Sequence, residues 1–329
     1  MASPLAREEA VAGVVLSVVV CTHNPRVDYL ARTLQSLRRQ SLAPDSWELL
    51  VIDNASTSPV GAGLVEWHPL GRVVREGELG LTHARMRGIS EAFAPLLVFV
   101  DDDNVLSPTY LADAMRIADE LPFLGAWGGQ VVGEFESPAP KWLRPYLSFI
   151  AVKDCREPIW SNEPFHEAAA PIGAGMCIRR GVARRYSELV ATDPIRVLLG
   201  RRGGQLSGCE DTDMALTAID MGLGLGRFPQ LVLTHIIPAG RMTEAYILKL
   251  AEESQISIFL LREIRRLPYP PYFSGSLLRR CATWMRLWTL PRMDRRIRQA
   301  LVRGQRRGKR MAAELLAARS ADGAAAARP

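Results

Sequence analysis

Short apolar runs alternate with amphipathic stretches over the first hundred residues. Residues 14–21 (VVLSVVVC) form a continuous, largely β-branched run, which is typical of a strand buried on both faces of a parallel sheet. Residues 29–40 repeat leucine at helical spacing beneath a basic outer face. The pattern continues with expected strands at 47–53, 71–76 and 95–100 and an expected helix at 81–94. This alternation predicts right-handed βαβ crossovers and a mostly parallel α/β sheet flanked by helices.

The periodicity weakens beyond residue 120. A Pro- and Trp-rich stretch at 138–165 shows no clear period. The remaining predicted elements are strand pieces at 125–136, a strand and short helix at 172–186, a loop entering a helix at 207–222, a strand at 226–238 and a long amphipathic helix at 243–266. The prolines of LPYPPY, residues 267–272, should end this last helix, because proline cannot continue a helical hydrogen-bond ladder.

The composition indicates a globular protein with a sizeable core. Of the 329 residues, 48 % are hydrophobic and 23 % are charged. The five cysteines are widely spaced and form no CxxC pair, so neither a disulfide framework nor a zinc site is predicted. Residues 1–10 do not resemble a secretory signal, and the apolar run 11–21 is too short to span a bilayer. We therefore expect a cytoplasmic protein, either soluble or peripheral at the inner face of the membrane.

The positive charge is concentrated near the C-terminus. Residues 279–310 hold twelve Arg and Lys against one acid, Asp294, whereas the rest of the chain has 29 bases and 34 acids. The same segment contains Trp284, Leu287 and Trp288, and a basic helix with such residues suits an anionic membrane surface. Packing against the body of the protein or against a partner helix is the alternative. No nucleic-acid-binding motif accompanies the charge, so nucleic acid is not an expected partner.

Three polar clusters follow predicted strands at the points where those strands end. They are CTHN (21–24), DNAS (53–56) and DDDN (101–104). In open parallel sheets, ligands bind at the carboxyl ends of the strands, where loops and helix N-termini converge. We therefore expect the three clusters to face one ligand cleft.

The run of three aspartates suggests a hard divalent cation. Carboxylate oxygens bind Mg²⁺ or Mn²⁺, usually together with phosphate oxygens of a substrate. In an extended segment Asp101 and Asp103 point to the same side and Asp102 to the other. A solvated acidic turn is the alternative interpretation. The chain has neither a GxxxxGK[ST] loop nor a GxGxxG after its first strand, so a P-loop or dinucleotide site is not predicted.

Five motifs, in order, carry a resemblance to a known family. SVVVCTHNP, ELLVIDNAS, REGELGLTHARMRGI, LLVFVDDDN and GCEDTDMALTAIDMG resemble those of a family 2 inverting glycosyltransferase, over roughly residues 14–265. The resemblance implies a GT-A fold, which is Rossmann-like. It also implies metal-dependent transfer, with inversion, from a nucleotide-diphospho-sugar, with UDP favoured, to an acceptor hydroxyl in polysaccharide, glycolipid or glycoconjugate biosynthesis. The QxxRW motif of processive synthases is absent, so a single sugar per encounter is expected.

The resemblance implies which residues bind the donor nucleotide. Thr22 and Asn24 in the first loop and Asp53 after the second strand match the residues that hold the base. Arg85, in GLTHARMRG, matches a basic residue near the diphosphate, although Met86 stands where the family often has Asn. An Asx turn at Asp53 and a surface helix position for Arg85 are the alternatives.

The family's DxD motif corresponds to the aspartate run. It implies that Asp103 binds Mn²⁺ or Mg²⁺, while Asp101 and Asp102 contact the nucleotide or the sugar. His235, at the end of the strand LVLTH, matches a metal or diphosphate ligand, and Arg241 is expected to meet the same phosphates. A lone histidine after a strand is otherwise more often structural.

The CEDTD sequence corresponds to the family's Glu-Asp motif. Inverting transfer needs one general base that removes the acceptor proton, and the resemblance assigns this role to Asp211. Glu210 is expected to orient Asp211 or the acceptor, and Asp213 to be an N-terminal helix acid. Helix capping by the whole cluster is the alternative.

These assignments give an expected domain organisation, and two functional alternatives stay open. The expected segments are an N-terminal tail at 1–13, a nucleotide-sugar-binding half at 14–120, an acceptor-binding and catalytic half of the same GT-A domain at 121–268, a basic helical extension at 269–311 and a disordered Ala-rich tail at 312–329. The acceptor is a carbohydrate or is lipid-linked, and its site should involve residues 134–170. The alternatives are a nucleotidyltransferase of related fold and a non-catalytic scaffold that binds a nucleotide-sugar or a membrane.

Overall fold

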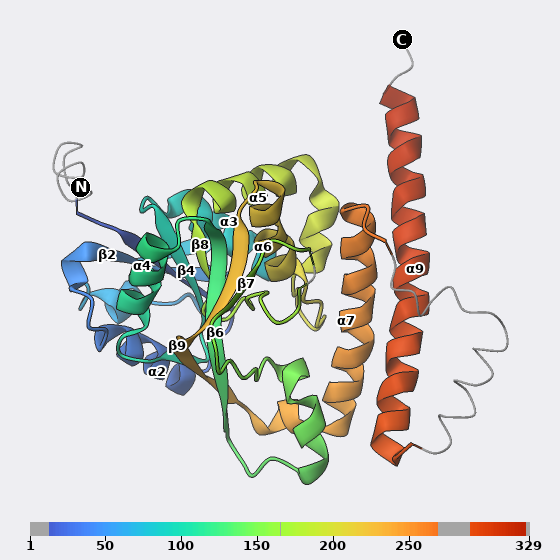
Figure 1. The fold of residues 1–329 in the computed structure, drawn as a ribbon, viewed down its shortest axis with the longest axis horizontal. Helices are drawn as coiled ribbons and strands as arrows, with labels where there is room; N and C mark the ends of the chain where they lie inside the picture. Colours follow the sequence, from blue (N-terminus) through green and yellow to red (C-terminus); the bar gives the residue numbers. More distant parts are fainter. Residues whose placement is uncertain (1–12, 165, 269–289, 327–329) are drawn as a thin grey trace.

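The computed structural model describes residues 13–164, 166–268 and 290–326. A single mixed sheet lies at the centre with helices on both faces, and two long helices stand side by side at one edge of the molecule (Figure 1). The strand order is β3-β2-β1-β4-β8-β6-β9-β5, with β7 also paired to β9.

The first four strands are parallel, as the sequence predicts. They are β1 Leu16–Thr22, β2 Trp47–Asn54, β3 Gly71–Glu76 and β4 Leu96–Asp101. Every residue of β1 and β2 is buried, which explains why these strands are continuous apolar runs rather than alternating ones.

The second half of the sheet adds short antiparallel ladders to the parallel ones. Its strands are β5 Asn104–Leu106, β6 Leu124–Phe135, β7 Ile159–Ser161, β8 Cys177–Arg179 and β9 Gly224–Ile237. β6 and β9 are parallel, whereas β8 is antiparallel to β4 and β6, and β5 and β7 are antiparallel to β9. The loop before β8 is bound to the end of β4, where the amide of Gly175 donates to Phe99 O at 2.9 Å. The chain therefore enters β8 from the carboxyl end of β4 and runs back.

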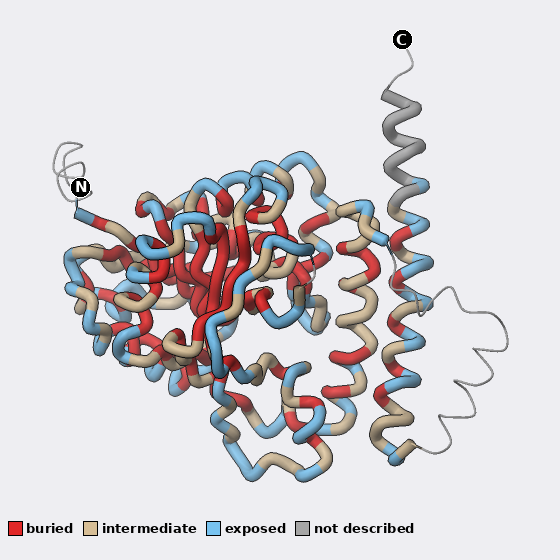
Figure 2. The backbone as a smooth tube through the Cα atoms, viewed as in Figure 1, coloured by how far each residue is buried: buried red, intermediate tan, exposed pale blue. Residues whose placement is uncertain are grey.

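Helices cover the two faces of the sheet in separate sets. On one face lie α2 Val27–Arg38 and α4 Tyr110–Glu120, and on the other lie α3 Leu81–Glu91, α5 Arg180–Thr192 and α6 Glu210–Asp220. Successive residues of β1 serve both layers, since Val18 packs with the first set and Val19 with the second. Buried residues accordingly concentrate in the central strands and the inner sides of the helices (Figure 2). α4 is not among the elements predicted from the sequence, although its apolar residues recur at helical spacing.

Short 3₁₀ segments connect these elements. They are η1 Pro44–Ser46, η2 Ala62–Val65, η3 Lys141–Ile150, η4 Pro194–Leu199 and η5 Ala239–Met242. The stretch 138–165 shows no period in the sequence, and its described residues, 138–164, contain only η3 and β7. Its lack of pattern reflects short elements that each bury few residues.

Two long helices form the C-terminal part of the described structure. α7 Glu244–Ile264 and α9 Arg292–Ala326 run in the same direction, with Arg303 of α9 bound to Glu252 of α7 at 2.9 Å. α9 continues through most of 312–329, where disorder is predicted from the sequence. The alanines of this segment favour a helix, because alanine is the strongest helix former. Trp284, Leu287 and Trp288, on which the predicted membrane contact partly rests, lie outside the described residues.

Candidate active site

The three polar clusters meet at one edge of the sheet. In the parallel register, Thr22 at the end of β1 lies opposite Asp53 of β2, and Cys21 lies opposite Asp101 of β4. Strands of similar length that start in register also end together, so their loops share one edge. The structure thus brings the predicted donor residues of β1, β2 and β4 together.

The three aspartates have different surroundings. Asp101 ends β4 with its side chain partly exposed, whereas Asp103 is only 7 % exposed. The Thr22 hydroxyl donates to the carboxylate of Asp102. Burial, reinforced by the charge of Asp103, raises the pKa of Asp102 to about 7. The three neighbouring carboxylates therefore do not all carry a full negative charge at neutral pH.

Asp103 lies against two residues that are more than 130 positions later in the chain. β5 pairs with β9 so that Asn104 faces His235. As a result, His235 Nε2 lies 3.4 Å and Arg241 Nη1 lies 3.0 Å from Asp103 Oδ2. Burial alone would raise the pKa of Asp103, but the proximity of His235 and Arg241 holds it below its usual value. The two residues predicted to bind the metal, Asp103 and His235, therefore lie in contact with the predicted phosphate-binding residue, Arg241.

The chemistry of this pair fits a divalent cation. His235 Nδ1 lies 3.1 Å from the carbonyl oxygen of Ile150, and donation to that carbonyl makes Nε2 an acceptor, which in this structure lies 3.1 Å from the donor Arg241 Nη1. Metal-binding histidines commonly use such a backbone partner to fix the ring. Within the described ranges, no group of three or more His, Cys, Asp and Glu residues is arranged to hold a metal. Phosphate oxygens of a substrate and water would have to complete the coordination of Asp103 and His235.

The predicted general base lies at the first turn of α6. Asp211 Oδ2 accepts a 2.7 Å hydrogen bond from the amide of Gly173, and Oδ1 accepts one from the amide of Thr212, also at 2.7 Å. The side chain is half-buried, so these two bonds fix its orientation while part of it stays accessible. The capping alternative is thus partly realised and does not compete with a chemical role.

Arg85 lies between the aspartate run 101–103 and the acids at the start of α6. It is 2 % exposed, and its Nη1 lies 3.0 Å from Glu210 Oε1 while Nη2 lies 3.8 Å from Asp101 Oδ1. A Cβ atom on Gly173 would come within 2.4 Å of this guanidinium, so the adjacent loop needs a glycine there. The resemblance implies that Arg85 lies near the diphosphate, and this stays a prediction. In the structure its guanidinium lies between the carboxylates of Asp101 and Glu210.

Glu210 should make stability depend on pH. Its Oε2 is buried without a hydrogen-bond partner, and burial, with the nearby charge of Asp211, raises the pKa from 4.5 to about 7 despite Arg85. Between these values the folded state binds more protons than the unfolded one, so the free energy of unfolding falls as pH rises. The difference in unfolding free energy between Glu210→Gln and wild type should therefore shift in favour of the variant as pH rises through this interval, by on the order of 1–3 kcal/mol.

Urea unfolding of both proteins at pH 5 and pH 7.5, near the lower end and just above the upper end of this interval, measures the difference. Glu188→Gln, at an exposed site on α5, serves as the control. A difference between Glu210→Gln and wild type that is equal at the two pH values would contradict the buried-proton explanation.

Asp53 is bound within its own loop. Its oxygens accept from the amides of Ser56 at 3.3 Å and Val60 at 3.0 Å, and Arg75 Nη1 lies 2.5 Å away. Burial would raise the pKa of Asp53, but these bonds lower it. The Asx-turn alternative is therefore present in the structure, and a base contact would have to share the carboxylate. Arg75 was missed in the sequence, although the β2–β3 register pairs it with Asp53.

Asn24 ties the first loop to the second. It has a positive φ of 47°. Its backbone N–H donates to the Ser56 hydroxyl at 2.8 Å, and its side-chain Oδ1 accepts from the backbone N–H of Thr57 at 2.8 Å. Asparagine tolerates this left-handed conformation better than most residues. Its first role in the structure is thus to shape the loops around the predicted base site.

A largely buried ion-pair cluster that is not predicted from the sequence lies between α6, η4 and the end of α7. Asp213 is fully buried, and Arg196 Nη1 lies 2.7 and 2.6 Å from its two oxygens. Arg265, at the end of α7, donates from Nε to Asp213 at 2.5 Å and from Nη1 to Asp220 at 2.7 Å. This cluster attaches the base-bearing helix to α7, which is a structural role rather than a chemical one.

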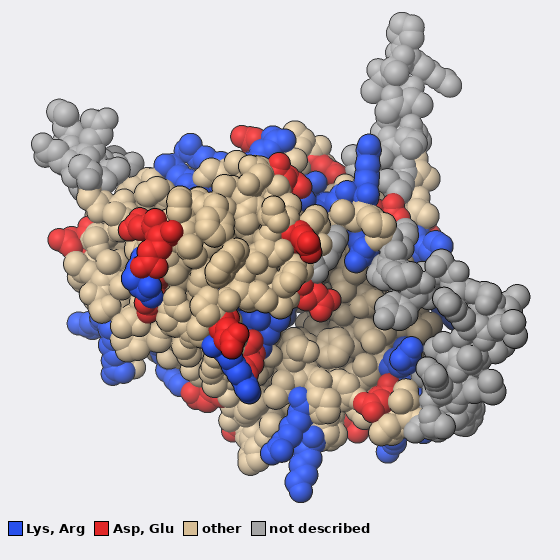
Figure 3. Space-filling model, viewed as in Figure 1, with Lys and Arg blue, Asp and Glu red and all other residues tan. Residues whose placement is uncertain are grey.

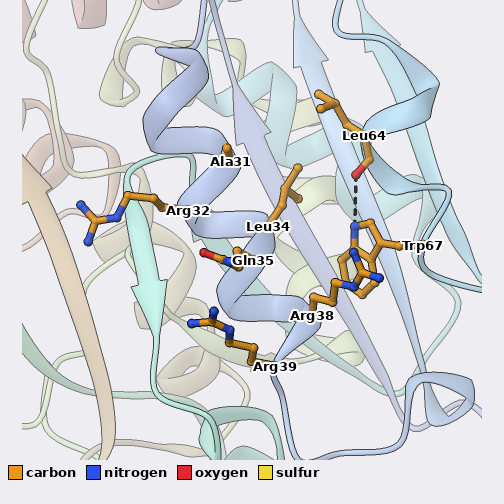
Figure 4. Close-up of a pocket in the computed structure, with 8 residues that line it drawn as sticks. All are labelled: Ala31, Arg32, Leu34, Gln35, Arg38, Arg39, Leu64 and Trp67. Carbon is orange, nitrogen blue, oxygen red and sulfur yellow. Dashed lines mark hydrogen bonds between the residues drawn. The ribbon is translucent and has the colours of Figure 1, made fainter.

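A groove of about 720 Å³ lies elsewhere, along α2 and η2 (Figure 4). It is lined by Ala31, Arg32, Leu34, Gln35, Arg38, Arg39, Leu64 and Trp67. None of the predicted site residues lines it. The groove therefore does not form part of the candidate active site.

Comparison with known proteins decides the family. The sequence model described as "Glycosyl transferase family 2" matches residues 17–186, which is more than half of the chain. The chain belongs to glycosyl transferase family 2. The match includes the three donor-side clusters and Arg85 and ends before Glu210. Membership of this family favours the glycosyltransferase interpretation over the nucleotidyltransferase one.

Relatives of this family 2 chain share only part of it. A validoxylamine A glucosyltransferase of Streptomyces hygroscopicus subsp. limoneus is 36 % identical over 104 residues, 30 % of this chain and 23 % of the relative. The uncharacterized glycosyltransferase YwdF of Bacillus subtilis (strain 168) is 32 % identical over 111 residues, 33 % of this chain and 40 % of the relative. The matches thus span less than half the length of these two relatives.

The fold has a match among solved structures. The crystal structure of GalNAc-T7 with UDP, GalNAc and Mn²⁺ is similar with a TM-score of 0.50 and 18 % identity, over 79 % of this chain and 52 % of that one. At this identity the similarity concerns the fold. It confirms the predicted GT-A architecture of this family 2 chain.

Proposed function

We propose that this family 2 protein transfers one sugar, with inversion, from a nucleotide-diphospho-sugar to an acceptor hydroxyl, and that UDP is the favoured nucleotide. The observation that supports this most directly is the meeting of two acidic clusters. Arg85 contacts Asp101, beside the Asp103–His235 pair, and Glu210, beside Asp211. A metal-type site and a candidate base thus lie at the same edge of the sheet.

In the proposed reaction, Asp211 takes the proton of the acceptor hydroxyl. The acceptor oxygen forms its new bond to the anomeric carbon as the bond from that carbon to the diphosphate oxygen breaks, on the opposite face. The nucleoside diphosphate leaves with the bonding electrons, through a transition state that resembles an oxocarbenium ion. The hydrogen bonds that Asp211 accepts from the backbone amides of Gly173 and Thr212 hold the base in one orientation.

The donor would be held by residues of β1, β2, β4 and β9. We assign the nucleotide and sugar to Thr22, Asn24, Asp53, Asp101 and Asp102. Asp103 and His235 would hold Mn²⁺ or Mg²⁺, which when bound stabilises negative charge on the departing diphosphate. Arg241, 3.0 Å from Asp103, is placed to exchange that carboxylate for a phosphate oxygen. GalNAc-T7 has a crystal structure with UDP and Mn²⁺, which are a nucleoside diphosphate and a divalent cation, the two kinds of ligand proposed for this site.

The acceptor and location form part of the proposal. The acceptor would be a carbohydrate or a lipid-linked molecule in polysaccharide, glycolipid or glycoconjugate biosynthesis, and nucleic acid is not a proposed partner. Among the described residues, no helix combines the length and apolar character needed to cross a membrane. We propose a cytoplasmic protein that makes peripheral contact with the inner face of the membrane through its basic C-terminal region.

Nucleotide binding tests the donor site. In calorimetry with UDP, GDP, CDP and TDP, one diphosphate should bind in the presence of Mn²⁺, and Asp103→Ala should weaken that binding at least about 10–100-fold. Asp113→Ala on α4, which removes another carboxylate away from this edge, should leave it unchanged. If no nucleotide binds in a metal-dependent manner, or if both variants bind as wild type does, the donor site is assigned wrongly.

A further inference from the structure

The helix α9 has one face that packs tightly against α7. This face is built from small and apolar residues at helical spacing: Ile297, Ala300, Gly304, Gly308 and Ala312, all buried. A Cβ atom on Gly304 would lie 2.1 Å from the carbonyl oxygen of Glu252, and one on Gly308 would lie 2.9 Å from Ile256 Cα. The two helices can approach this closely only when the glycines of α9 face α7. The rotational orientation of α9 is therefore fixed, and so is the set of residues on the side away from α7.

The far side of α9 is basic. Positions 298, 302, 306 and 309 recur every three or four residues and lie opposite the packed face. Arg298, Arg306 and Lys309 are exposed, with Val302 exposed among them at 37 %. We call these four residues the outer face of α9. The two acids of α9 whose side chains are described lie elsewhere, since Asp294 accepts from Tyr146 and Glu314 lies 3.9 Å from Arg310.

The basic residues on the flanks of α9 are neutralised by α7. Arg303 and Arg307 both bind Glu252, at 2.9 and 2.7 Å, and Arg296 binds Glu244. Among the described residues, no acid forms an ion pair with Arg298, Arg306 or Lys309. Within the described part of the chain, acids of α7 thus pair with the flank cations, and the cations of the outer face have no ion-pair partner.

The body of the protein does not share this charge. On the face shown in Figure 3, its acidic and basic side chains are scattered and often adjacent. Outside residues 279–310 the acids outnumber the bases, 34 to 29. A partner attracted by positive charge would therefore be drawn to α9 rather than to the protein as a whole.

We propose that the outer face of α9 is a docking surface for an anionic lipid bilayer. The face is straight, extends about 17 Å from residue 298 to 309 at the rise of an α-helix, and has an apolar residue between its cations. Basic residues contact anionic head groups, and a valine among them can enter the head-group boundary. This inference rests on the membrane contact in the proposed function and gives it a defined surface. α7 connects that surface to α6, which bears Asp211, through Arg265 and Asp213.

Vesicle sedimentation with the full chain tests the surface. Wild type should bind vesicles that contain phosphatidylserine and not vesicles of phosphatidylcholine alone. The triple variant Arg298→Gln/Arg306→Gln/Lys309→Gln should bind the anionic vesicles about 100-fold more weakly, at about fivefold per cation. The matched variant Arg296→Gln/Arg303→Gln/Arg307→Gln makes the same charge change on the flanks and should lose less than about tenfold.

Several outcomes would overturn the proposal. They are equal losses in the two triple variants, binding of wild type to neutral vesicles as strong as to anionic ones, and tight binding to a DNA duplex without vesicle binding. Circular dichroism confirms that both variants remain helical. Metal-dependent UDP binding is measured on the same samples, so that a failure of the docking surface and a failure of the donor site are told apart.

Discussion

Asp211→Asn should lower kcat by about 10²–10⁴-fold while the affinity for the donor nucleotide changes little. Asn has the size and shape of Asp, but its single amide oxygen can replace only one of the two carboxylate oxygens that accept from the Gly173 and Thr212 amides at 2.7 Å, so one of these two bonds is kept. What is lost is the ability to take a proton from the acceptor at neutral pH. Initial rates and calorimetry with the nucleotide diphosphate separate the two effects.

The matched control is Asp220→Asn, the same substitution at the other end of α6. Asp220 is exposed and bound to Arg265, so kcat should stay within about twofold. A non-catalytic scaffold would show no turnover to lose in either variant. A fall in kcat for Asp211→Asn that is no larger than that for the control would exclude Asp211 as the base.

Asp213→Ala should destabilise the protein by about 3–5 kcal/mol. The side chain is fully buried between Arg196 and Arg265, whose side chains are also buried. Its removal would leave two guanidinium groups out of water without their main counter-charge, and this cost is larger than the net value of the intact pairs. Urea unfolding, with the change taken from the midpoint at constant slope, measures the effect.

Asp220→Ala is the comparison for stability. It removes the exposed partner of the same Arg265 and should cost less than about 1 kcal/mol. Since Asp211 and Asp213 are two residues apart, the pair of predictions also separates chemistry from stability within one helical turn. An Asp213→Ala variant that unfolds at the wild-type midpoint would show that the cluster does not anchor α6.

Local patterns in the sequence determined much of the fold. The β-branched runs of β1, β2 and β4 indicate strands because they are buried on both faces, and side-chain period is a local property. The leucines of α2 and the acids at the first turn of α6 are likewise local signals. The position of polar clusters directly after strands predicted one ligand edge, since the ends of parallel strands meet.

Only the tertiary structure decided which charged residues share a contact. Arg85 meets Glu210 across 125 positions, and Arg241 meets Asp103 across 138. No periodicity encodes such pairs, because they depend on β8 running back between β4 and β6 and on β5 pairing with β9. Burial then decided their roles: it turned Arg85 toward carboxylates and made Asp213 an anchor beside an accessible Asp211. The sequence by itself determined most of the elements and the edge of the sheet at which the candidate site lies. Tertiary packing determined which residues are partners, because desolvation and charge pairing arise only when distant segments meet.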